Sequence, residues 1–186
     1  SELTMGLPPH VTAATGVDAM VHAIEAFTSK IKKNPMSDLF AKEGLRLMAG
    51  SIQTAVHNGS DKKAREEMLL GAMLAGQAFA NSPVAAVHAL AYPLGGHFHI
   101  PHGLSNSLVL PHVMRFNLNE ACDLYAELAP IIFPAETFVG SSLEIASRLI
   151  ENIEALIKDL GLPTRLKEMD IDEDFLPTLA QDAMLQ

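Results

Sequence analysis

The sequence contains no tryptophan and one cysteine, and aromatic residues make up only 5% of its 186 positions. The single cysteine, Cys122, excludes an intrachain disulfide framework and is typical of a reducing compartment, so we expect a cytoplasmic protein. Its position in a helical pattern predicts a small core residue. The shortage of aromatic residues, beside many Ala, Leu and Met residues, favours helix over sheet.

Positive charge is also scarce. The 13 Lys and Arg residues are outnumbered by 22 Asp and Glu residues, which gives a net charge of −9 and argues against nucleic acid or membrane surfaces as partners. No block of about 18 apolar residues occurs, so we predict no transmembrane segment. Signal peptides and lipidation motifs are not found, and the start at Ser1 rather than Met predicts a fragment of a longer protein.

Apolar residues recur at helical spacing, and no segment alternates apolar and polar residues as a strand does. We predict an all-α helical bundle of about eight helices, forming one domain over residues 1–186. Proline, cap residues and glycine place the helix ends. Seven of the expected helices begin at or near Pro8–Pro9, Ser37–Asp38, Ser60–Asp61, Pro101, Leu118, Ser141–Ser142 and Glu173. A further short helix, which carries His88, is expected after a break at residues 81–83.

Several residues within the helical patterns predict how the helices pack and where they end. Gly16 interrupts the first helical pattern and predicts close packing at that turn. Residues 68–80 are apolar on all sides, which predicts a central helix. We expect Pro93 with Gly95–Gly96 to end the helix of His88, and Pro111 to kink the next one. The expected inward-facing residues of the second helix are Leu39, Leu45, Leu47 and Ile52.

The run from Met68 to Met114 contains no Asp, Glu, Lys or Arg. In a chain with 19% charged residues, such a run predicts a buried segment. It nevertheless carries several imidazoles, and buried imidazoles need hydrogen-bond partners or a metal ion. The histidines of this run are His88, His97, His99, His102 and His112.

Asp18 and His22 lie four residues apart and therefore share one face of the first predicted helix. His88 and His102 flank the Gly95–Gly96 pair, where we expect the chain to reverse, so both imidazoles can point into one space. One carboxylate and three imidazoles form a suitable ligand set for Fe²⁺ or Zn²⁺. An Asp–His pair at this spacing also arises often by chance.

The other candidate residues have weaker support. His97 and His99 lie between two candidate ligands, so we expect them to line the same cavity. Glu25, one turn after His22, is either an acceptor for an imidazole N–H or a surface or interhelical carboxylate. We assign the remaining histidines to a hydrogen-bonded core or to the surface; they are His10, His57 and His112.

Four stretches together resemble the iron-containing (group III) alcohol dehydrogenase family. They are GVDAMVHAIEAF, NPMSDLFA, AVHNGSDKKAREEMLLGAMLAGQAFANS and VHALAYPLGGHFHIPHGLSNSLVLPHVMRFN. The resemblance is strong over residues 1–120 and weaker beyond. It implies a helical domain similar to that of dehydroquinate synthase, which carries the metal, and a separate Rossmann-like N-terminal domain that binds NAD or NADP. The family's one Asp and three His ligands fall on Asp18, His22, His88 and His102.

The chain departs from the family pattern in two respects, namely parts of the family expected beyond its two ends and the residue at position 92. The glycine-rich pyrophosphate-binding loop is not in it, and the family's usual last helix is expected beyond Gln186. Many members also have a histidine where this chain has Tyr92. A tyrosine hydroxyl can relay a proton, although its ordinary pKa is about 10 rather than about 6.5. The alternative is a core tyrosine packed against the turn at Gly95.

The resemblance implies a metal-dependent alcohol dehydrogenase. The metal would polarise the oxygen of a small alcohol or aldehyde, while hydride is exchanged with NAD(P) in the N-terminal domain, so this chain alone is expected to be inactive. Tyr92 is the catalytic candidate, and the oligomeric state stays open, a homo-oligomer included. The candidate residues of the substrate cavity are Leu94, His97, Phe98 and His99.

Two other classes of protein stay open. A helical metal-dependent hydrolase would use bound water as the nucleophile, but such enzymes usually place His and Asp side by side, and no His-Asp dipeptide occurs here. A non-enzymatic metal-binding helical bundle, for storage or oxygen carriage, uses Glu-x-x-His pairs, which this chain also lacks.

Overall fold

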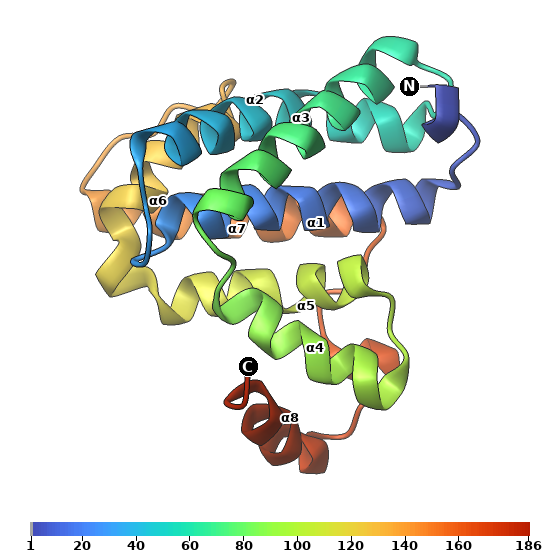
Figure 1. Cartoon of the computed structure of the whole chain (residues 1–186), viewed down its shortest axis with the longest axis vertical. Coiled ribbons are helices and arrows are strands. Elements are labelled where there is room, and N and C mark those ends of the chain that lie inside the picture. Colours follow the sequence, from blue (N-terminus) through green and yellow to red (C-terminus); the bar gives the residue numbers. More distant parts are fainter. Residues whose placement is uncertain (1) are drawn as a thin grey trace.

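Helix α1 (Pro9–Thr28) crosses the middle of the molecule in the computed structural model, which describes residues 2–186 (Figure 1). Among these residues there are eight α-helices and no strand, so the all-α prediction is confirmed. The other α-helices are α2 (Pro35–His57), α3 (Lys62–Asn81), α4 (Ala86–Phe98), α5 (His102–Phe116), α6 (Leu118–Ile132), α7 (Ser142–Asp159) and α8 (Leu176–Ala183). Short 3-10 helices lie at Glu2–Thr4, Leu166–Met169 and Glu173–Phe175. None of these helices combines the length and hydropathy that a transmembrane segment requires.

Helices α2 and α3 lie on one side of α1, and α4 and α5 lie on the other (Figure 1). The predicted close packing at Gly16 of α1 is confirmed. A Cβ atom at this position would lie 2.8 Å from Cε of Met68 on α3 and 3.0 Å from Cδ1 of Ile52 on α2. The missing side chain therefore allows three helices to meet at one point.

Most helix ends follow the predicted signals. Asp61 caps α3 by accepting a hydrogen bond from the amide of Ala64, and Ser141 caps α7 in a capping box with Glu144. Helix α2 begins earlier than predicted, because the side chain of Asn34 is its N-cap and accepts from the amide of Ser37. The expected single last helix is also wrong, since a 3-10 turn at residues 173–175 precedes α8.

Two burial predictions are wrong. Leu39, predicted to point inward on α2, is 63% exposed. Helix α3 was expected to be central, yet Leu69, Leu70 and Met73 are each about half exposed. Only one side of α3 packs on α1 and α2, so the opposite side of this apolar helix has no covering element within the described part of the chain.

Helix α4 continues through Pro93 and both glycines instead of ending there. A proline inside a helix removes only one backbone hydrogen bond and can be tolerated where packing holds the helix together. The reversal occurs later, at His99, whose φ of 55° places it in the left-handed region and whose amide bonds to Gly95. Pro111 likewise lies within a continuous α5.

Helix α8 packs on α4 at the end of the molecule far from α2 (Figure 1). A small separate core holds it there, made by Leu94, Ile100, Ile171 and Leu179. The main core lies around α1, α2, α6 and α7. Cys122, predicted as a small core residue, is only half-buried and packs at the edge of the main core.

Candidate metal centre

Three helices bring together all four side chains that the sequence singled out. Asp18 and His22 come from α1, His88 from α4 and His102 from the first turn of α5. Each offers one ligand atom, and these atoms lie within 4.8 Å of one another. His88 is buried, whereas His102 is about half exposed at the rim, so the cluster opens to solvent on one side.

The ring of His22 is held in one orientation by its own helix. Its Nδ1 lies 2.9 Å from the backbone carbonyl oxygen of Asp18. A carbonyl can only accept, so Nδ1 carries the proton and the lone pair lies on Nε2. Burial lowers the pKa of His22, and the Asp18 carboxylate opposes that effect. The ring therefore favours the neutral form, which is the form that binds metals.

The ring of His88 is oriented by a second carboxylate. Its Nδ1 lies 2.6 Å from Oε2 of Glu25, a buried residue on α1. A carboxylate oxygen accepts this hydrogen bond from Nδ1, so the lone pair of His88 also lies on Nε2. Glu25 therefore makes the expected contact with an imidazole, which is also a contact between two helices, and the surface alternative is wrong because the residue is buried.

The Nε2 atoms of His22 and His88 lie 3.1 Å apart, and both carry lone pairs. Two lone pairs at this distance repel unless a cation lies between them. Oδ1 of Asp18 lies 3.9 Å from Nε2 of His88 and 3.7 Å from Nε2 of His102. Ligands about 2.1 Å from one ion are at most about 4.2 Å apart, so these pairs fit a shared ion.

Asn106, which the sequence analysis missed, contacts the same cluster. Its Nδ2 lies 2.5 Å from Oδ1 of Asp18, 3.2 Å from Nε2 of His88 and 3.1 Å from Nε2 of His102. An amide has two hydrogens, so it cannot serve all three acceptors. Its buried Oδ1 has no partner among the described residues. The i, i+4 spacing after His102 could have revealed this residue.

Two aromatic rings cover the cluster. Phe79 of α3 lies over His22, with ring centroids 4.6 Å apart. Tyr92 stacks on His102 at 5.8 Å with an interplanar angle of 21°, and 47% of it is exposed. The core alternative for Tyr92 is therefore wrong, because its ring lies at the open rim of the cluster.

The predicted cavity residues lie elsewhere. Leu94 is buried in the small core beneath α8, and Phe98 packs against Phe175 with ring centroids 4.9 Å apart. His97 bonds through Nε2 to the carboxylate of Asp182 on α8, at 2.6 Å. Helical geometry explains this placement, since His97 follows His88 by nine residues and so faces the opposite side of α4. His99 ends the helix and is exposed.

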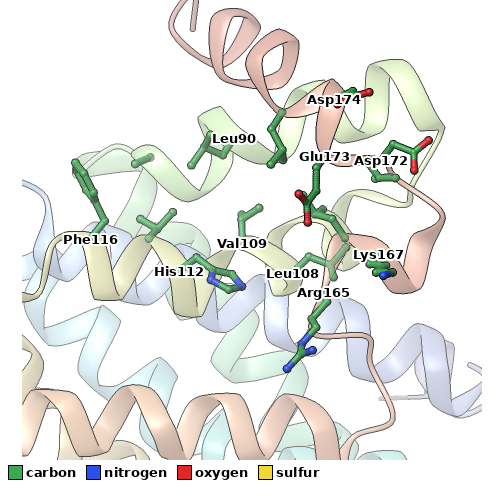
Figure 2. Close-up of a pocket in the computed structure, with 15 residues that line it drawn as sticks. Leu90, Leu108, Val109, His112, Phe116, Arg165, Lys167, Asp172, Glu173 and Asp174 are labelled. Atoms are coloured by element: carbon green, nitrogen blue, oxygen red, sulfur yellow. The ribbon is translucent and has the colours of Figure 1, made fainter.

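The three histidines assigned to a core or surface position are all exposed: His10, His57 and His112. His112 lines an open groove of about 1120 Å³ between α4, α5 and the chain around residues 165–176 (Figure 2). Leu90, Val109 and Phe116 form apolar parts of its wall, and Arg165 with Glu173 adds charge. None of the four clustered side chains lines this groove.

Curated relatives match this chain over almost its whole length. Long-chain-alcohol dehydrogenase 1 of Geobacillus thermodenitrificans (strain NG80-2) is 44% identical over 185 residues, which are 100% of this chain and 46% of the relative. A 1,3-propanediol dehydrogenase of Klebsiella pneumoniae is 40% identical over 183 residues, 98% of this chain and 46% of that protein. The chain thus spans about half the length of the curated relatives it matches.

Solved structures show the same fold. The structure of a 1,3-propanediol oxidoreductase matches with a TM-score of 0.93 and 39% identity, over 98% of this chain and 47% of that chain. An alcohol dehydrogenase from Oenococcus oeni matches with a TM-score of 0.91 and 33% identity, over 98% of this chain and 47% of that chain. Residues 12–186 also match the family described as "Fe-containing alcohol dehydrogenase family, C-terminal". The chain belongs to the Fe-containing alcohol dehydrogenase family.

Proposed function

We propose that this chain is the metal-binding helical domain of an NAD(P)-dependent alcohol dehydrogenase. The observation that carries the proposal is the convergence of Asp18, His22, His88 and His102 from three helices, with their ligand atoms within 4.8 Å. Iron(II) is the proposed ion because of the family, and zinc(II) accepts the same ligand types. The dinucleotide would be held by an N-terminal domain outside this chain.

When bound, the ion supplies a Lewis acid that favours the alkoxide of an alcohol or polarises an aldehyde. The residues of this chain prepare the site. His22 and His88 present their unprotonated Nε2 atoms, and Asp18 supplies negative charge beside them. The ring of Phe79 keeps water from His22 on the α3 side. The hydroxyl of Tyr92, at the open rim, would hand a proton to the substrate oxygen or accept one from it.

The substrate class is a small alcohol or aldehyde. The names of two relatives, which refer to 1,3-propanediol and lactaldehyde, support a small substrate, whereas the name of the Geobacillus relative refers to long-chain alcohols. An alcohol or aldehyde is common to all three names. A cytoplasmic location is proposed from the lone Cys122, and the net charge of −9 supports the proposal that nucleic acid is not a partner.

Metal analysis of the purified chain tests the proposal. After dialysis with excess Fe²⁺ or Zn²⁺ under reducing conditions, we expect about one ion per chain, and a chelator should remove it. His88→Ala should abolish stoichiometric binding because it removes the most buried ligand. His112→Ala is the matched control, as this exposed imidazole lies outside the cluster. Equal metal content in both variants would refute the assignment.

Calorimetric titration of the same chain with NAD and NADP tests the proposal that the dinucleotide is held outside this chain. No strand-to-helix turn rich in glycine, the usual cradle for a pyrophosphate, occurs in residues 2–186. We therefore expect no binding near the micromolar range. Tight binding of either dinucleotide would mean that the cofactor site lies in this chain.

A further inference from the structure

We propose that Glu25 is a positioning residue, which sets the proton on His88 and joins the metal cluster to the start of α4. This inference rests on the proposed function. Glu25 is only 4% exposed, although a carboxylate in that position loses most of its hydration. It touches none of the atoms that would contact an ion. Its burial therefore calls for a role that an ordinary core residue cannot perform.

Both oxygens of this carboxylate are used, and they have different partners. Oε1 accepts the backbone N–H of Val87 at 2.7 Å, and Oε2 accepts from Nδ1 of His88 at 2.6 Å. The two partners are neighbours in sequence but more than 60 residues away from Glu25. One side chain of α1 thus holds both the first turn of α4 and the imidazole that this turn carries.

Capping of α4 accounts for only one of these bonds. Ala85, at the N-cap position, has no side chain that could cap the helix, so Oε1 of Glu25 replaces it from α1. The positive end of the helix dipole also stabilises a carboxylate at this place. A cap, however, requires one oxygen, and the second oxygen acts only on His88. That second contact distinguishes a positioning residue from a structural cap.

The contact with Oε2 determines which nitrogen of His88 is free. With an acceptor beside Nδ1, the ring keeps its proton there and turns the lone pair of Nε2 toward His22 and Asp18. A glutamine at position 25 would have the same shape but different chemistry. Its oxygen can still accept from Val87, and its NH₂ group then donates to Nδ1 and moves the ring proton to Nε2, which blocks that ligand atom.

Cobalt(II), a spectroscopic probe for a metal site, tests whether Glu25 keeps Nε2 of His88 free to bind an ion. The test uses the 186-residue chain. Competition with a chelator should give a dissociation constant about 10- to 100-fold higher for Glu25→Gln than for the unchanged chain. Nitrogen NMR of the metal-free protein should show His88 protonated at Nδ1 in the unchanged chain and at Nε2 in the variant. Glu127→Gln, an exposed carboxylate paired with Lys42, is the control and should alter neither measurement.

The outcomes separate the two proposals. If the unchanged chain does not bind cobalt(II) in a His88-dependent manner, the proposed function fails. If it does, but Glu25→Gln binds cobalt(II) equally well and keeps the proton on Nδ1, the positioning role is refuted, whatever happens to the melting temperature. Should the variant not fold, the tautomer of His88 in the unchanged chain decides, since a proton on Nε2 would overturn the inference.

Discussion

Gly103 lies directly against Ala14, because a Cβ atom on Gly103 would be only 2.6 Å from the carbonyl oxygen of Ala14. The same Cβ would lie 3.3 Å from Cβ of Asp18. The absence of a side chain lets the first turn of α5 reach α1 one turn before Asp18. That approach brings His102 next to the other three candidate ligands.

Gly103→Ala should therefore destabilise the fold and loosen the cluster. The obstructing atom belongs to the backbone of α1 and cannot turn away, so the start of α5 must move. We expect a loss of about 1–3 kcal/mol in the free energy of unfolding, measured in urea, together with weaker cobalt(II) binding. Gly76→Ala on α3 is the control, since nothing lies within 4 Å of its added Cβ. Equal losses of unfolding free energy and equal cobalt(II) binding in the two variants would contradict the prediction.

Tyr92→Phe removes one oxygen from a ring that is half exposed and stacked on His102. Because the ring is not part of the core, the free energy of unfolding should change by less than about 0.5 kcal/mol, and metal content should stay the same. In the full-length enzyme, turnover should fall roughly 10- to 100-fold if the hydroxyl positions a proton. Normal turnover with normal metal content would rule out a catalytic role for Tyr92.

Arg65 is buried, and its guanidinium donates to three uncharged oxygens. It donates to the carbonyl of Gly59 at 3.0 Å, to Oγ1 of Thr12 at 2.7 Å and to the carbonyl of Leu7 at 3.3 Å. Arg65→Met removes these three hydrogen bonds, one of which is fully buried, and should cost about 2–4 kcal/mol in chemical denaturation. Arg46→Met, which removes only an exposed pair with Glu43, should cost less than about 1 kcal/mol. Similar losses of unfolding free energy in the two variants would show that the contacts of Arg65 stabilise the fold no more than an exposed ion pair does.

Burial raises the pKa of Tyr125 to about 12, although a hydrogen bond with Asn117 partly opposes this. An unfolded tyrosine loses its proton near pH 10, so above that pH the unfolded state gains stability relative to the fold. The stability that Tyr125 contributes should thus be present below pH about 10 and decline as pH rises toward about 12. The free energy of unfolding of Tyr125→Phe should show a smaller decline over this window. Parallel pH curves for both proteins would disprove the prediction.

The sequence by itself determined the local features of this protein. Helical spacing and the lack of strand alternation fixed the all-α class, and Ser141 with Glu144 marked the start of α7 in the chain itself. Asp18 and His22 had to share a face because four residues make about one helical turn. These features depend on neighbours within a turn or two, which is the range over which a sequence pattern is informative.

The tertiary structure decided how the helices meet. The contact of Glu25 with His88, and the position of Asn106 beside Asp18, join residues that no local spacing relates. Sequence patterns also placed the chain reversal at two glycines, whereas the packed structure carries α4 through them to His99. The exposure of the apolar face of α3 could not be predicted from the sequence pattern either, because what covers a helix depends on its neighbours in space. Distances between helices are set by packing, and packing is a property of the whole chain.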